Sequence, residues 1–301
     1  MSQQTPYLSS DRSWAGAERL VYGQMVCRTS NNIGDDIQSI AAAQLLPRVD
    51  RLIDREELKS FRSDRPACLV MNAWFMHNPK NWPPSDDICP IFVGFHVDEG
   101  SRASIAKYAD YLKKYEPIGT RDRGTSRFLA TLGLSTEVTY CLALTFPERD
   151  KAPTNGKVVI VDADHIAIPR TLKRGAVSIT HKVAPIESEA RIRYAMQLIE
   201  YYRDNAALVI TTRLHSALPC SAMGIPTIFF GDPSNMRLTV FNDIGGQIHN
   251  ETLYNKYLLK GILGRAIERV DWTPKPLDVS HHKAHLLHAF SKRMQKMLLP
   301  T

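Results

Sequence analysis

The stretch Ala207-Leu-Val-Ile-Thr-Thr-Arg-Leu-His-Ser-Ala-Leu-Pro-Cys-Ser-Ala-Met-Gly-Ile-Pro-Thr-Ile-Phe-Phe230 decides the fold of this chain. Its pattern predicts a buried strand, a tight turn, a short helix, a glycine stop and a second strand. Arg213 and His215 stand at the turn, where the helix begins. The first turn of a helix offers unpaired N–H groups and a positive dipole end. The stretch therefore predicts an enzyme that binds a phosphorylated or carboxylated small molecule and moves a proton on it.

The composition is that of a globular protein long enough for two domains. The 301 residues are 44% hydrophobic and 23% charged. No window approaches the roughly 18 consecutive apolar residues of a membrane span, and the first residues lack the apolar core of a secretory signal. The five cysteines are scattered and never form a Cys-x-x-Cys pair. These features predict a cytoplasmic protein with free thiols.

The net charge of +7 suits an anionic partner. No nucleic acid is expected, because the chain has no arginine-rich run, no aromatic-basic stacking motif and no zinc-finger spacing. Anionic substrates and peripheral contact with an anionic membrane surface explain the charge equally well. Nothing in the sequence indicates an oligomeric state.

Strand-like apolar runs alternate with helix-period segments, which is typical of an α/β fold with mainly parallel sheets. Strands are expected at residues 20–26, 67–71, 91–95, 157–161 and 176–180, and helices at 35–46, 101–114 and 187–203. A polar stretch with two prolines, residues 147–156, is the expected linker. The predicted parts are an N-terminal domain at 1–150, a C-terminal domain at 151–275 and a basic helix at 276–301.

A second strand end that opens a helix is Gly119-Thr-Arg-Asp-Arg123. Ordinary helix capping explains this segment as well as a ligand site does. Because strand ends in parallel sheets are where ligands bind, we expect Arg121 to face Arg213 across a cleft between the two halves.

The third segment is Asn31-Asn-Ile-Gly-Asp-Asp36. Two acids at the start of a helix are favoured by the helix dipole, which is the structural explanation. A carboxylate at such a turn can also serve as a base toward a hydroxyl group. The pattern leaves both interpretations of Asp35 and Asp36 open.

Several histidines have two interpretations. His181 follows a strand in the second half, so its position makes it a candidate binding residue, although a lone histidine is usually structural. The terminal helix carries His281, His285 and His288 on one face, a spacing that permits a metal site. No acidic or thiol partner lies nearby in sequence, so we expect a solvated basic helix and no metal.

Together these segments resemble the polysaccharide pyruvyltransferase family. The matching motifs, in the order of the family, are Asn32-Ile-Gly-Asp-Asp36, Gly119-Thr-Arg-Asp122, Thr180-His181, Thr211-Thr-Arg-Leu-His-Ser-Ala-Leu-Pro-Cys220 and Gly224-Ile-Pro226. The resemblance implies two Rossmann-like domains facing a cleft, as in GT-B glycosyltransferases, with the acceptor on the N-terminal side and the donor on the C-terminal side. It also implies phosphoenolpyruvate as donor and a hydroxyl pair of a sugar as acceptor, in a polysaccharide or a lipid-linked oligosaccharide. The product would be a pyruvate ketal, with release of phosphate.

The resemblance also implies roles for single residues. Carried over by motif, the donor site would consist of Arg121, Arg213, Leu214 and His215. Many relatives carry an acidic residue where this chain has Cys141-Leu-Ala-Leu144, so no role for that acid transfers.

The chemistry of this reaction suggests further roles. We expect His215 to supply the proton that the enol carbon needs, and Asp35 or Asp36 to take the proton of the sugar hydroxyl. Asn32 and His181 are expected to bind substrate. Because arginines supply the positive charge, we expect no metal and no cofactor beyond phosphoenolpyruvate as co-substrate.

Two alternatives remain open. A GT-B glycosyltransferase using a nucleotide-activated sugar predicts a ribose-binding carboxylate or a phosphate loop in the second half, where no clear glycine-rich loop is present. A non-catalytic carbohydrate-binding protein could share the fold, but its Arg-Leu-His block would be expected to be lost. Residues 73–87, with their aromatic and proline content, are expected to form a sugar-stacking wall or a packed loop.

Overall fold

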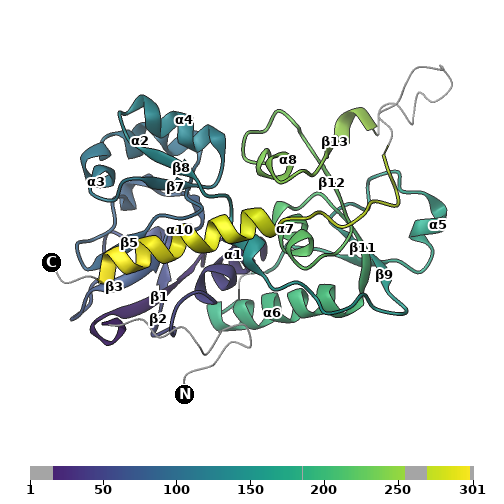
Figure 1. The fold of residues 1–301 in the computed structure, drawn as a ribbon, viewed down its shortest axis with the longest axis horizontal. Helices are drawn as coiled ribbons and strands as arrows, with labels where there is room; N and C mark the ends of the chain where they lie inside the picture. Colours follow the sequence, from purple (N-terminus) through teal and green to yellow (C-terminus); the bar gives the residue numbers. More distant parts are fainter. Residues whose placement is uncertain (1–15, 185, 255–269, 299–301) are drawn as a thin grey trace.

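Two parallel sheets, one in each half of the chain, form the centre of the molecule (Figure 1). The computed structural model describes residues 16–184, 186–254 and 270–298. The prediction of an α/β fold with mainly parallel sheets is confirmed. Among the described residues, no helix has the length and apolar character needed to cross a membrane.

The first sheet has the strand order β2–β1–β3–β5. Its strands are β1 (Val21–Val26), β2 (Arg51–Asp54), β3 (Ala67–Val70) and β5 (Ile88–Ile91). The central strands β1 and β3 are buried throughout, which explains their continuous apolar runs. The prediction of a strand at 91–95 is wrong, because β5 ends at Ile91. The chain then turns at Gly94, which has a φ of 71°.

The second sheet has the strand order β10–β9–β11–β12–β13. Its strands are β9 (Lys157–Val161), β10 (Val177–Ile179), β11 (Ala206–Thr211), β12 (Thr227–Gly231) and β13 (Ile248–Asn250). Between β11 and β12 lies α7 (Leu214–Ala222), so the predicted strand–turn–helix–strand is confirmed. Residues that follow β9, β10 and β11 therefore gather at one edge of the sheet.

Three predicted helices begin near their expected positions, namely α1 (Gly34–Ala43), α4 (Arg123–Thr131) and α6 (Ser188–Asn205). Two short helices, α5 (Arg170–Lys173) and α8 (Val240–Asp243), were not predicted. The helix predicted at 101–114 is instead split into α2 (Arg102–Ala106) and α3 (Ala109–Lys113). The split occurs because Tyr108, with φ −119° and ψ 34°, departs from helical geometry.

Short elements connect these parts. Two-stranded parallel ladders pair β4 (Trp74–Phe75) with β6 (His96–Val97) and β7 (Ile118–Thr120) with β8 (Thr136–Val138). Single 3₁₀ turns are η1 (Ala17–Arg19), η2 (Arg55–Glu57), η3 (Pro79–Asn81), η4 (Glu99–Ser101) and η5 (Leu142–Thr145).

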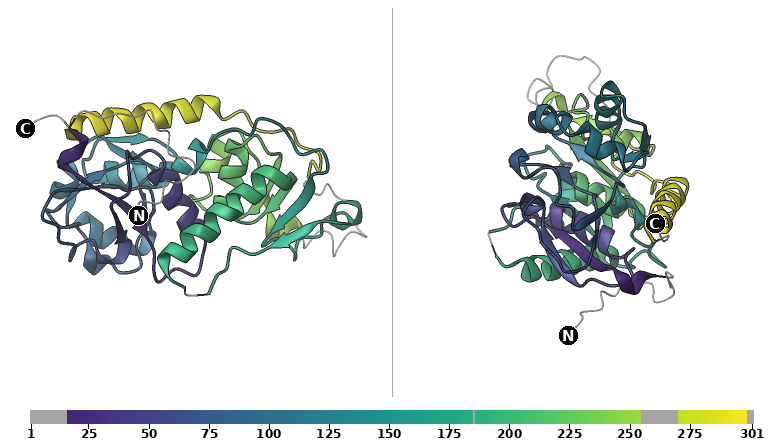
Figure 2. Two further views of the ribbon diagram at one scale, coloured as in Figure 1. Left: turned by 90° about the horizontal axis from the view of Figure 1, so that it is seen from below. Right: turned by 90° about the vertical axis from the view of Figure 1, so that its left-hand side faces the viewer.

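One hydrophobic cluster joins the two sheets. It includes Tyr22 and Val26 of β1, Val159 of β9 and Phe229 of β12. The terminal helix α10 (Ser280–Leu298) returns from the second half and lies along the first, where its Phe290 is buried (Figure 2). The two halves thus share a packed core. The domain limits at 150 and 275 and the GT-B arrangement remain predictions.

Candidate functional site

A cavity of about 450 Å³ lies beyond the carboxyl ends of β1, β7, β10 and β11. Both halves of the chain contribute to its wall. Seven of the eight predicted site residues line it, namely Asn32, Asp35, Arg121, His181, Arg213, Leu214 and His215. The lining also includes residues outside those eight, namely Thr29, Ser30, Asn31, Gln38, Trp74, His77, Thr212, Arg237 and Leu238. Arg121 and Arg213, which follow strands in different halves of the chain, thus line one cavity, as predicted.

Arg121 follows β7 and is completely buried on the cavity wall. Its Nη1 donates to Oε1 of Gln38 at 3.2 Å, and its Nε lies 4.0 Å from Oδ2 of Asp122. Nε and Nη2 have no hydrogen-bond partner among the described residues. Burial lowers the pKa of this guanidinium, but it remains protonated because arginine starts from a very high value. A buried cation with free donors is a site for an anion.

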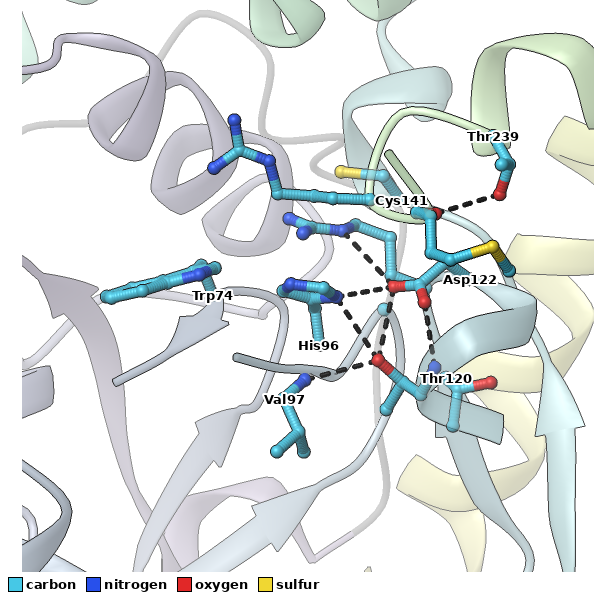
Figure 3. A network of polar contacts seen from close by, with 12 residues as sticks. Trp74, His96, Val97, Thr120, Asp122, Cys141 and Thr239 are labelled. Carbon is cyan, nitrogen blue, oxygen red and sulfur yellow. Dashed lines mark hydrogen bonds and ion pairs between the residues drawn. The ribbon is translucent and has the colours of Figure 1, made fainter. Parts of the chain in front are cut away.

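The next residue, Asp122, is held in place by a polar network that includes His96 (Figure 3). Nδ1 of His96 lies 2.6 Å from Oδ2 of Asp122, while the backbone N–H of Thr125 donates to Oδ1 at 2.8 Å. Burial alone would raise the pKa of Asp122, but the His96 hydrogen bond and the Arg121 charge lower it. Asp122 is therefore a fixed anion beside the guanidinium of Arg121.

Arg213 caps the start of α7 at the end of β11. Its backbone N–H donates to Oγ1 of Thr211 at 2.9 Å, and its Nε donates to Oδ2 of Asp162 at 2.6 Å. The side chain is 29% exposed, so its outer nitrogens can reach a ligand. The guanidinium is thus held from one side and available on the other.

Asp162 is a positioning residue that sequence reasoning missed. It stands directly after β9, with φ 50°, and accepts hydrogen bonds from the Thr180 hydroxyl, the His181 N–H and Arg213. Burial alone would raise its pKa, but these hydrogen bonds and the Arg213 charge lower it. One carboxylate thus fixes two predicted site residues, and its left-handed backbone is the kind of strain found at functional sites.

His215 is the second residue of α7 and departs from helical geometry, with φ −86° and ψ 17°. Burial lowers its pKa well below the ordinary value, and the charges of Arg121 and Arg237 lower it further. The imidazole of the free protein is therefore neutral at pH 7. Gly34 lets α1 approach this point, since a β-carbon there would lie 3.1 Å from Cβ of His215.

Asp35 and Asp36, adjacent on α1, have different surroundings. Asp35 lies on the cavity wall, where its Oδ2 accepts from the Ser30 hydroxyl and its Oδ1 from Nε2 of Gln38. Asp36 is outside the lining and buried, and its Oδ2 lies 2.6 Å from Nη2 of Arg191 on α6. Only Asp35 can reach a ligand in this geometry.

Asn32 and His181 lie next to each other where the two halves meet. The N–H of Ile33 donates to the carbonyl of His181 at 2.8 Å, and Asn32 forms a β-bridge with Lys182. Nε2 of His181 lies 2.9 Å from the Tyr202 hydroxyl, whereas its buried Nδ1 has no partner among the described residues. Burial lowers the pKa of His181 to about 4, so it too is neutral at pH 7.

Trp74, His77 and Arg237 are the other side chains with chemistry on this wall. Trp74 packs against His77, with ring centroids 4.6 Å apart, and both belong to the predicted aromatic loop at residues 73–87. Arg237 is exposed and adds a third guanidinium. The sequence does not single out Arg237, because it lies in a loop and not directly after a strand.

The terminal histidines have separate neighbours. Nε2 of His285 lies 3.2 Å from the carbonyl of Val138, while His288 is exposed. In the described part of the chain, no three histidine, cysteine or acidic side chains gather as metal ligands do.

We predict that two buried neutral histidines make the protein sensitive to acid. Burial lowers the pKa of both His181 and His96 to about 4, below the ordinary 6.5 of an unfolded chain. The unfolded chain therefore binds their protons first, so stability is full above pH 6.5 and is lost as the pH falls toward 4. By pH 5 each histidine should cost about 2 kcal/mol of unfolding free energy. Urea unfolding at pH 7 and pH 5 tests this.

The matched variants are His181→Gln and His288→Gln. The loss of stability between pH 7 and pH 5 should shrink by roughly 2 kcal/mol in His181→Gln and stay unchanged in the exposed control His288→Gln. Equal pH dependence in both variants would contradict the buried, neutral assignment.

We predict a second effect at Asp162. Asparagine tolerates a positive φ, so Asp162→Asn should keep the fold but weaken the ion pair that holds Arg213. The KM of the anionic donor expected from the sequence should rise about tenfold, or ~1.4 kcal/mol, with a smaller change in kcat. Asp164→Asn, at an exposed carboxylate two residues away, is the control. A donor KM unchanged in Asp162→Asn, with melting temperatures equal, would remove this positioning role.

Comparison with known proteins assigns the chain. A search of curated proteins returned no match. The family model described as polysaccharide pyruvyl transferase matches residues 32–234, which include every predicted site residue. This match covers well over half of the 301 residues. The chain therefore belongs to the polysaccharide pyruvyl transferase family and is a transferase enzyme.

Proposed function

We propose that the enzyme transfers the pyruvyl group of phosphoenolpyruvate to a hydroxyl pair of a sugar and forms a ketal. The observation that carries this proposal is Arg121, a completely buried guanidinium with two unpartnered nitrogens on the cavity wall. Arg213 and Arg237 line the same cavity, so three guanidinium groups can serve one small polyanion. Phosphoenolpyruvate carries both a carboxylate and a phosphate, which suit the bidentate fork of arginine.

The reaction needs two proton movements. The methylene carbon of phosphoenolpyruvate gains a proton, and one sugar oxygen bonds to the neighbouring carbon. The second sugar oxygen then displaces phosphate from that carbon and closes the ketal. The two sugar hydroxyls together lose two protons. One balances the proton that the methylene carbon gained, and the other leaves on the released phosphate.

His215 is the proposed acid and Asp35 the proposed base. In the free protein His215 is neutral, because burial and the charges of Arg121 and Arg237 depress its pKa. A bound phosphate offsets those charges and raises this pKa, so the proton enters together with the donor. Asp35, the carboxylate on the cavity wall, is placed to accept a proton from a hydroxyl.

The proposed acceptor is a sugar in a polysaccharide or a lipid-linked oligosaccharide. Trp74 and His77 line the same cavity as Asp35 and come from the N-terminal half, so their rings are the proposed contacts to the sugar. Asn32 and His181 complete the proposed binding residues, and Leu214 supplies an apolar wall. Because arginines supply the positive charge, the proposal includes neither metal nor cofactor.

The proposed setting is the cytoplasm, with the acceptor reached at the inner face of the membrane. The net charge of +7 supports peripheral contact with an anionic surface. The cavity between the two sheets supports a GT-B-like arrangement with the donor on the C-terminal side.

Donor discrimination tests the proposal. Purified enzyme is incubated with a panel of glycans and either phosphoenolpyruvate or a nucleotide-activated sugar. We expect inorganic phosphate release from phosphoenolpyruvate that depends on the glycan. Transfer from the nucleotide sugar alone would instead identify a glycosyltransferase, and binding of glycan without either reaction a carbohydrate-binding protein.

A further inference from the structure

A second cavity, of about 590 Å³, lies between α10 and the edge of the first sheet. We call it the α10 groove. Its apolar lining comes from β5, the loop before β7 and the end of α10, namely Pro90, Ile91, Phe92, Pro117, Ala289 and Met297. The volume is in the range of small-molecule sites. None of the residues assigned to transfer lines it.

The rim of the α10 groove is positive. Lys114, Lys292 and Lys296 line it and are exposed, and no carboxylate in the described ranges forms an ion pair with them. Two acidic residues also line the groove. Glu137 is paired with Arg293 at 2.8 Å, and Glu116 accepts a hydrogen bond from the Ser135 N–H. The three lysines therefore have no ion-pair partner among the described residues, and Glu116 is the one acidic residue of the lining without an ion pair.

We propose that the α10 groove binds an anionic lipid, with its aliphatic chain on the apolar floor and its head group on the three lysines. An apolar channel alone would take any chain, but the lysine rim selects a negative head group. Lysine suits this position, because its flexible stem packs on apolar surface while its ammonium reaches outward.

Other occupants fit less well. β5 is the edge strand of its sheet, but it has only four residues and contains Pro90, which makes it a poor template for an added peptide strand. A second copy of this chain, paired through the same groove, would bring its own three lysines against these three. Charge complementarity therefore favours the lipid.

Cys89 provides a direct probe. It lines the groove, and the other four cysteines are buried. The rate of its reaction with a thiol reagent is measured in the full-length protein with dodecyl phosphate, dodecyltrimethylammonium or inorganic phosphate, each surfactant below its micelle concentration. We expect dodecyl phosphate alone to slow labelling at least about tenfold.

Matched charge variants test the head-group contact. Lys292→Glu/Lys296→Glu should weaken protection by dodecyl phosphate at least about tenfold. Lys107→Glu/Lys113→Glu makes the same charge change at exposed positions outside the groove and should behave as wild type. All these side chains are exposed, so each variant should fold.

Several outcomes would overturn the proposal. One is that dodecyl phosphate protects Cys89 equally in both double variants. Another is that dodecyltrimethylammonium or inorganic phosphate protects Cys89 as well as dodecyl phosphate does. A third is that dodecyl phosphate leaves the labelling rate of Cys89 unchanged. Protection that rises with protein concentration, together with dimers in sedimentation velocity, would assign the groove to a second copy. None of these readouts requires transferase activity, so the lipid site and the proposed reaction can fail independently.

Discussion

The His215→Ala variant should lose turnover by roughly 10²–10⁴-fold while it binds phosphoenolpyruvate within a few-fold of wild type. The reason is that a general acid acts in the transition state, whereas the three arginines hold the donor. His215→Gln should keep a hydrogen bond to phosphate without restoring the rate. Calorimetric donor binding and single-turnover rates at saturating donor measure the two effects separately.

The same titration tests the proton linkage. The pKa of His215 is depressed in the free protein by burial and by Arg121, and bound phosphate should raise it. Donor binding should therefore take up a proton near neutral pH, and affinity should fall as the pH rises. Titrations in buffers of different ionisation enthalpy should show this uptake in wild type and in the exposed control His288→Ala, but not in His215→Ala.

One result would give His215 another role. If donor binding disappears in His215→Ala while the residual rate at saturating donor equals that of wild type, His215 is a binding residue. The acid must then be sought elsewhere on the wall, and His181 is the next candidate because it lines the same cavity.

The Arg121→Lys variant should weaken phosphoenolpyruvate binding at least about a hundredfold, or ~2.7 kcal/mol. Lysine keeps the positive charge but loses the planar fork, and in this buried position it cannot present two donors in the same geometry. Arg213→Lys should lose only about tenfold, because that side chain is partly exposed and partly engaged by Asp162.

The control for Arg121 lies in the same motif. Arg123 is exposed and pairs with Asp243 at 3.0 Å, so Arg123→Lys should bind the donor as wild type does. Circular dichroism and thermal unfolding check that each variant is folded, and Arg213→Lys provides the test if Arg121→Lys is not. Wild-type donor affinity in both folded variants would remove the arginines from the donor site.

Much of the fold could be predicted because it depends on local patterns. The buried run before Thr212, the turn at Arg213 and the stop at Gly224 each have a physical reason within a few residues, and β11, α7 and β12 follow them. The prediction of one long helix at 101–114 was wrong at Tyr108, because the spacing of apolar residues does not reveal a break in the helix there.

The site residues were predictable only where they directly follow a strand of a parallel sheet. Arg121 and Arg213 follow strands, and parallel sheets bring such residues to one edge. Asp162 acts through residues that β10 and β11 place beside it, so no linear motif marks it. The contrast between Asp35 and Asp36 depends on Arg191, which is 155 residues from Asp36 in sequence.

Transfer of the enol carbon itself tests the proposed reaction most directly. Phosphoenolpyruvate labelled with ¹³C at the carbon that bears phosphate is incubated with the enzyme and an acceptor glycan, and NMR follows the label. The proposal predicts that the label appears as a quaternary ketal carbon on the glycan, in an amount equal to the phosphate released. Label recovered only as free pyruvate, or left in phosphoenolpyruvate while the glycan is modified from another donor, would contradict it.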